Sequence, residues 1–236
     1  MLKKTRLWAC GFILVAAAIL LMLWRKEQLV LALGLAILGV LALSFVLFEA
    51  KAATAEKLVL LAVLCALSSA GRVLFTPIPS VQPSSFIIIV TGMVFGPEMG
   101  FMCGSLTAFA SNLLLGQGPW TPFQMFAWGA MGFLSALLSG ALEQSRLARA
   151  AYGVLWGFVF GWFMNLWFMH SVGGGGPFLP GYIAACVASL PFDLAHALSN
   201  AFFLLLISDS FLAMLRRVSI KYGLVTQRPL PLEEIT

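Results

Sequence analysis

The sequence predicts an all-α integral membrane protein, in which two N-terminal transmembrane helices precede a six-helix core. Three observations predict this class. The 236 residues are 61% hydrophobic and only 10% charged, with a mean hydropathy of +0.99, whereas soluble domains are about 45–50% apolar and about 25% charged. The charge-free stretches leave room for roughly eight spans of about 20 residues. The alternation of apolar and polar residues that marks a β-barrel is missing. This composition excludes a water-soluble enzyme.

Residues 1–50 are expected to form a two-helix membrane extension. The apolar run Leu7–Trp24 follows three basic residues, as in a signal peptide, but it lacks a small-residue cleavage site. We therefore expect a retained helix, followed by a second helix over Gln28–Phe48. A charged, alanine-rich linker, Glu49–Lys57, marks the clearest change in composition. The other expected units are the core over residues 57–215 and a cytoplasmic basic tail over residues 216–236.

Six spans are expected in the core. They are Leu58–Phe75, Ser84–Gly96, Met99–Leu115, Phe123–Leu142, Ala151–Met169 and Tyr182–Ile207. Residues 76–83, 116–122 and 173–181 are rich in proline and glycine, which interrupt helices and mark loops. Residues 143–149 form a charged loop in this reading.

The distribution of Lys and Arg predicts the orientation. If both termini are cytoplasmic, 11 of the 14 basic residues lie in inner segments, as the positive-inside rule requires. The net charge of +5 is therefore assigned to topology, and no nucleic-acid partner is expected. The three Pro/Gly-rich loops then share the outer face. Irregular backbone near a membrane persists where it is buried or lines a cavity, so we expect a ligand site among these loops.

Polar residues within the spans are costly in lipid and therefore informative. Asp193, His196 and Asn200 are spaced three and four apart, on one helix face. This face suits a proton relay, a ligand contact or a structural clamp that pairs Asp193 with Arg72. Arg72 itself could extend to the lipid headgroups or donate to a carbonyl or phosphate of a ligand.

Small residues recur on the first core helix, at Ala62, Ala66 and Ala70. Their four-residue spacing places them on one face, where another helix can approach closely. That helix belongs either to the same bundle or to a partner protein.

Catalytic motifs are missing from the sequence. It contains no HExxH, GxSxG or Walker A pattern, and its four cysteines form no CxxC pair. His170 and His196 with one nearby carboxylate are too few for a metal site. We expect no enzyme activity, disulfide framework, metal site or intrinsic cofactor.

Several segments together resemble a known family. The six core helices, the Ala62-xxx-Ala66 pattern and the uncharged outer loops resemble the substrate-binding S component of energy-coupling factor (ECF) vitamin transporters. Residues 95–100, Phe-Gly-Pro-Glu-Met-Gly, look like the turn between the second and third helices of that family. The block Ser111–Gly129 and the pattern Pro191-Phe-Asp193-xx-His196-xxx-Asn200 look like the cobalamin subgroup.

The resemblance implies a multi-pass protein of the cell membrane that binds cobalamin from outside and has no ATPase of its own. Its implied partners are a membrane coupling subunit, docked on the alanine face, and two ATPases that use ATP. The candidate substrate-binding residues offer amide, aromatic and charged groups: Arg72, Asn112, Gln117, Trp120, Gln124, Trp128, Asn165, His170, Asp193 and His196.

Other functions remain open at this point. The same amides and aromatic rings would suit riboflavin, thiamine or a queuosine-like nucleobase. An ion-coupled secondary transporter with an Asp193/His196 relay is a further alternative, although the repeated halves typical of such transporters are not detected. A structural membrane protein without a ligand is the third.

Overall fold

The computed structural model describes residues 11, 13–17, 28–49, 54–172 and 178–224, and every regular element among them is a helix. The helices are α2 (Gln28–Glu49), α3 (Ala55–Leu74), α4 (Ser84–Phe95), α5 (Pro97–Leu115), α6 (Thr121–Leu137), α7 (Ser139–Leu142), α8 (Arg146–Val172), α9 (Phe178–Leu206) and α10 (Ser208–Lys221). The all-helical class is confirmed for this part of the chain. Most of the predicted span Leu7–Trp24 and most of the basic tail lie outside the described residues.

Three of the described helices are long and apolar enough to cross a membrane. They are α3, the Arg146–Met169 part of α8, and α9, while Leu33–Glu49 and Ser84–Phe95 form shorter apolar helices. The prediction of eight spans stays a prediction, because α5 and α6 do not meet the same criteria and the first expected span is not described.

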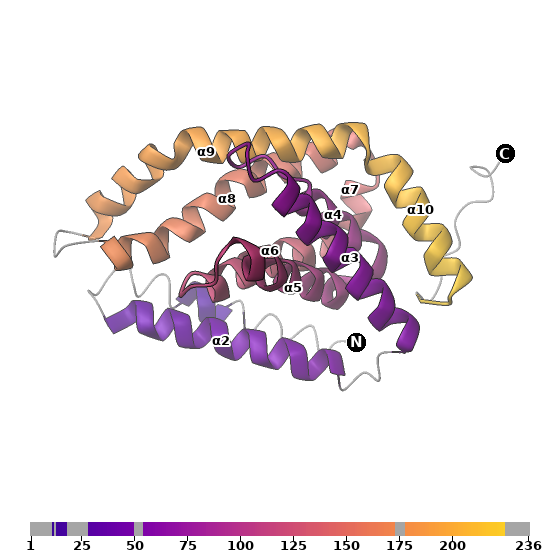
Figure 1. The fold of residues 1–236 in the computed structure, drawn as a ribbon, viewed down its shortest axis with the longest axis horizontal. Helices are drawn as coiled ribbons and strands as arrows, with labels where there is room; N and C mark the ends of the chain where they lie inside the picture. Colours follow the sequence, from indigo (N-terminus) through magenta and orange to yellow (C-terminus); the bar gives the residue numbers. More distant parts are fainter. Residues whose placement is uncertain (1–10, 12, 18–27, 50–53, 173–177, 225–236) are drawn as a thin grey trace.

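The short helix α4 lies at the centre of the bundle and is apolar on every side. All residues from Ser84 to Met93 are buried, as expected of a helix that neighbours surround completely. It packs against α3, α5 and α6, and also against α10. Figure 1 shows α3 crossing in front of the α5–α6 pair, with α8 and α9 side by side above them.

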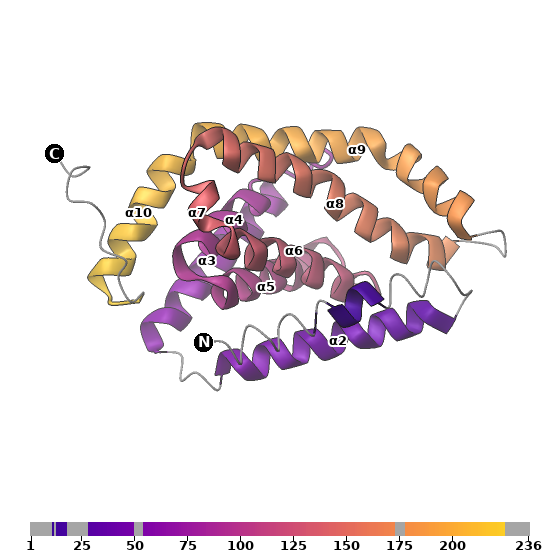
Figure 2. The same cartoon turned by 180° about the vertical axis from the view of Figure 1, so that it is seen from behind.

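Glycines permit the closest helix contacts in this core. An added Cβ at Gly100 of α5 or at Gly132 of α6 would collide with the backbone of the other helix. In lipid, such close approach replaces the hydrophobic drive that holds soluble bundles together. The helices α5 and α6 are therefore closely packed, and α2 packs against both of them, along the lower edge of Figure 2.

Several predicted boundaries differ from the structure. The expected charged loop 143–149 is helical from Arg146 onwards, because Ser145 caps this helix: its Oγ accepts from Ala148 N at 3.0 Å. Arg146 and Arg149 also form ion pairs with Asp209 of α10. The expected span Phe123–Leu142 is broken at Leu138 into α6 and α7, and α10 continues to Lys221, beyond the expected end of the core.

Candidate functional site

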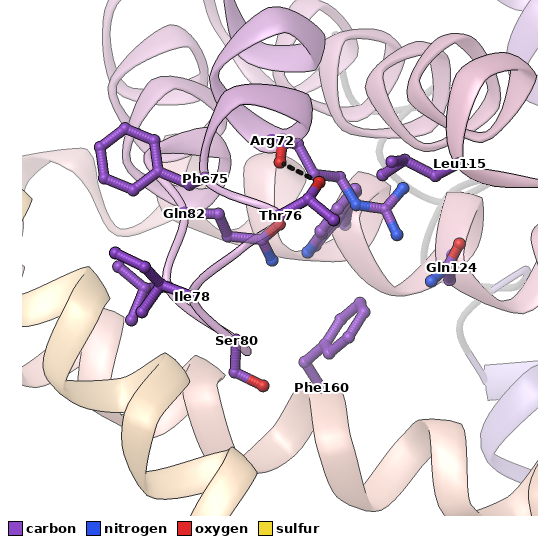
Figure 3. Close-up of a pocket in the computed structure, with 11 residues that line it drawn as sticks. Arg72, Phe75, Thr76, Ile78, Ser80, Gln82, Leu115, Gln124 and Phe160 are labelled. Atoms are coloured by element: carbon purple, nitrogen blue, oxygen red, sulfur yellow. Dashed lines mark hydrogen bonds between the residues drawn. The ribbon is translucent and has the colours of Figure 1, made fainter.

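A pocket of about 270 Å³ opens where the C-terminal end of α3 meets α5, α6 and α8. The segment that follows α3 forms one wall, and α6 and α8 form the other (Figure 3). The described lining residues are Arg72, Phe75, Thr76, Ile78, Ser80, Val81, Gln82, Leu115, Gln124, Trp128 and Phe160.

Arg72 is partly buried near the end of α3, and its guanidinium faces the pocket. Its Nη1 donates to Ser111 Oγ and to Asn112 Oδ1, both at 2.6 Å. Its Cζ lies 5.0 Å from the centre of the Trp128 ring, within the range of a cation–π contact. In Figure 3 the guanidinium extends into the space between Leu115, Gln124 and Phe160.

Asn112 connects this arginine to the opposite wall. Its Nδ2 donates to Gln124 Oε1 at 2.7 Å and to Thr121 Oγ1 at 3.1 Å. Thr121 Oγ1 in turn donates to Gln117 Oε1 at 2.9 Å. Because Asn112 is 1% exposed, these bonds are shielded from water and fix the orientation of the Gln124 amide at the pocket.

The segment from Phe75 to Pro83 is held at both ends. Thr76 Oγ1 donates to the carbonyl of Arg72 at 3.2 Å. At the other end, Gln82 N donates to Ser199 Oγ of α9 at 2.9 Å, and Ser199 Oγ donates back to Gln82 O at 3.2 Å. Between those anchors the segment makes turn hydrogen bonds, from Ile78 N to the Phe75 carbonyl at 2.9 Å and from Val81 N to the Ile78 carbonyl at 3.2 Å.

Asp193 and His196 point into the bundle but do not line the pocket. His196 Nε2 lies 2.9 Å from Ser85 Oγ, and its ring meets Phe160 edge-on at 5.3 Å. Asp193 Oδ2 accepts a 2.9 Å bond from Ser189, which also accepts from Asn165 Nδ2. The considered Asp193–Arg72 ion pair does not form in the described structure, because Asp193 is satisfied within α9 and Arg72 contacts α5.

The structure therefore divides the predicted site residues into groups. Arg72, Gln124 and Trp128 meet in the pocket wall, and Asn112 supports them from behind. Gln117 and Trp120 lie in the turn before α6, where Trp120 packs on Trp167 with 5.5 Å between ring centres. Asn165 and Asp193 form a separate polar group through Ser189, between α8 and α9, and His196 bonds to Ser85 of α4. The side chain of His170 lies outside the described residues.

Two parts of the pocket were not predicted as site residues. Phe160 gave no signal, because one aromatic residue among many in an apolar helix is indistinguishable in sequence. Residues 76–83 were predicted as one of the outer loops that form the ligand site, but no single residue of that loop was named, although its amide and hydroxyl side chains between prolines were a usable sign. Among the described residues, no group of three or more His, Cys, Asp or Glu side chains could hold a metal ion.

Comparison with known proteins gives one match. The family model described as "ECF transporter, substrate-specific component" matches residues 56–208, more than half of the chain. No curated protein and no solved structure gives a significant match. The match begins one residue into α3 and ends at the first residue of α10, so it contains the whole pocket.

Proposed function

The chain belongs to the family of substrate-specific components of ECF transporters, and from this premise we propose that it binds its substrate in the pocket beside Arg72. Members of this family are substrate-binding subunits and not enzymes, and they associate with an ECF module of membrane and ATPase subunits. The observation that supports the pocket is the meeting of Arg72, Gln124 and Trp128 around one cavity. Small-molecule sites typically have a mostly apolar wall and a small number of polar groups that point into the cavity.

Cobalamin is the substrate that we propose from the resemblance of residues 111–129 to the cobalamin subgroup. Asn112, Gln124 and Trp128 all come from this block. Gln124 and Trp128 line the pocket and offer an amide and a flat aromatic surface, while Asn112 holds Gln124 from behind. These groups are suited to the peripheral amides and the phosphate of a corrinoid.

The volume of the pocket favours a second candidate, a smaller vitamin or precursor such as riboflavin, thiamine or a queuosine-like nucleobase. Drug-sized ligands occupy pockets of about 300–1,000 Å³, and the cavity of about 270 Å³ lies just below that range. A corrinoid is much larger. Cobalamin would enter only if the Phe75–Pro83 segment moved away from α6 and α8.

We further propose that the pocket opens to the outside and that both termini are cytoplasmic. Basic residues support this orientation: Arg146, Arg149 and Arg216 gather around α7, α8 and α10, away from the pocket, where Arg72 is the one charged residue of the described lining. The coupling subunit would dock on the alanine face of α3, where Ala62, Ala66 and Ala70 are all exposed.

Titration of the purified full chain against cobalamin, riboflavin, thiamine, biotin and folate tests the proposal. We expect saturable, stoichiometric binding of one of these compounds. Saturable binding of cobalamin would select the first candidate, and binding of a smaller vitamin alone would select the second. Lack of binding to every compound, together with failure to copurify with a coupling subunit and ATPases, would contradict the function.

A further inference from the structure

The guanidinium of Arg72 is only partly satisfied by the protein. Nη1 uses both of its hydrogens, on Ser111 and Asn112, whereas Nε and Nη2 make no hydrogen bond to any residue that the structure describes. An arginine carries five N–H donors in a fixed plane. Three donors therefore remain available beside the pocket, and two of them, one on Nε and one on Nη2, are parallel on one edge of the group.

The positive charge of Arg72 also lacks a counter-charge. The ion pairs found among the described side chains join Arg146 and Arg149 to Asp209, and Arg216 to Glu143, all remote from Arg72. Of the described residues that line the pocket, Arg72 alone is charged. Its contacts are a hydroxyl, an amide oxygen and the face of Trp128, which are neutral.

An unpaired charge at this position is energetically unfavourable. Arginine is costly within a membrane span, and burial of a cation without an anion is costly in any protein interior. A snorkelling arginine would reach the headgroups, but two 2.6 Å bonds hold this side chain inward against α5. The arrangement keeps one edge of a planar cation open toward a cavity, the geometry that binds a carboxylate or phosphate with two parallel bonds.

We propose that the substrate carries an anionic oxygen group, a carboxylate or a phosphate, which binds Nε and Nη2 of Arg72. This inference rests on the proposed function of the pocket and adds the chemical class of its substrate. The Trp128 ring beneath the guanidinium and the Gln124 amide beside it would contact the uncharged part of the same molecule.

Matched pairs of ligands that differ in this group test the inference. The wild-type chain in detergent is titrated with riboflavin and riboflavin 5′-phosphate, with biotin and biotin carboxamide, and with cobalamin and cobinamide, which lacks the phosphodiester together with its ribose and base. Hydrogen bonds to a charged group correspond to about a 10- to 100-fold change in affinity. We expect the anionic member of the pair that binds to have the lower Kd by about this factor.

Three variants identify the residue responsible. Arg72→Gln removes the charge, and Asn112→Asp places a carboxylate of the same shape where an amide oxygen now lies 2.6 Å from Nη1. Both variants should abolish the preference for the anionic member of the pair. Asn112→Asp keeps the arginine, so it tests the inference even if Arg72→Gln folds poorly. Arg217→Gln, at an exposed position of α10, is the matched control and should keep the preference.

The outcomes separate the inference from the function. Equal affinity for both members of a pair that binds, or a preference retained in Asn112→Asp, would overturn the anion assignment and leave the binding function intact. Failure of every member of every pair, and of thiamine and folate, to bind the wild-type chain, together with failure to copurify with a coupling subunit and ATPases, would overturn the proposed function, and the inference with it.

Discussion

Asn112 shows how one buried amide can organise a site between three elements. Its oxygen accepts from Arg72 of α3, and its nitrogen donates to Thr121 and Gln124 of α6. The side chain of an asparagine has one acceptor and two donor hydrogens, and each of these functions is used here. Loss of this residue would leave the Arg72 guanidinium and the Gln124 amide without their common partner.

Replacement of Asn112 by Ala is expected to destabilise the protein and weaken substrate binding together. Buried groups left without a partner cost about 1–3 kcal/mol each, so we expect the free energy of unfolding to fall by at least this amount. Thermal unfolding of the purified chain and the Kd of its ligand measure the two effects.

Ser111→Ala is the matched control, because Ser111 also accepts from Arg72 but donates only to backbone carbonyls of its own helix. Its effect should be clearly smaller. Equal effects of the two variants would show that Asn112 does not organise the site.

At the scale of elements, glycine faces hold the long helices together. Three glycines spaced four apart on α8, Gly153, Gly157 and Gly161, all face α9. An added Cβ would meet Leu204 and Asn200 at the first position, Ala197 at the second and Asp193 at the third. This face also brings Asn200 Nδ2 to the Gly153 carbonyl at 2.9 Å. Because these positions of α8 are glycines without side chains, the polar face of α9 can lie directly against the backbone of α8.

Gly157→Ala should destabilise the bundle. A Cβ at this position would lie 2.5 Å from the Cα of Ala197, so α8 and α9 would have to separate. Overpacking of a fitted core typically costs about 1–3 kcal/mol, measurable as a lower melting temperature in detergent. In the exposed position Gly39 of α2, a Cβ would meet nothing within 4 Å, so Gly39→Ala should leave the melting temperature unchanged or slightly raised.

The two kinds of small-residue face were not equally predictable from the sequence. The alanine spacing on α3 was visible, because it stands among larger apolar residues and needs only one helix to define it. The glycine faces require knowledge of which helices are neighbours, since each glycine is explained by atoms of another element. The start of α8 at Arg146 is a different case, because Ser145 caps it locally, and a serine at that position is a sign that the sequence alone contains.

For the whole molecule, the sequence predicted the all-helical class of the described residues, but it did not predict how the polar side chains are arranged. Arg72, Gln124 and Trp128 were predicted from the cost of polarity in a membrane and from resemblance, and they meet in one pocket. Asp193 and His196 were predicted on the same grounds, yet they bond to Ser189 and Ser85. Polarity within a span indicates that a side chain faces inward, but it does not distinguish a ligand contact from a bond between helices.

The outward face of α3 is the surface on which we propose that the coupling subunit docks. Its small residues Ala62, Ala66 and Ala70 are exposed, and the larger Val59, Val63 and Leu67 beside them are exposed by 63%, 57% and 47%. The opposite face carries the buried Leu61, Leu64, Cys65, Ser68 and Ser69. A helix of a coupling subunit could approach closely along the alanines, because only methyl groups separate the two backbones.

Ala66→Trp should separate the two activities. The indole would project from the bundle, so the purified chain should keep its melting temperature and its Kd for the substrate. Close approach of a partner helix would be lost, so uptake in cells and copurification of the coupling subunit should fall at least tenfold, which corresponds to about 1.4 kcal/mol of docking free energy. Val187→Trp is the matched control, because Val187 is 66% exposed on α9 and lies outside the alanine face. Loss of substrate binding in Ala66→Trp would show that this face packs within the bundle, and unchanged uptake would place the docking surface elsewhere.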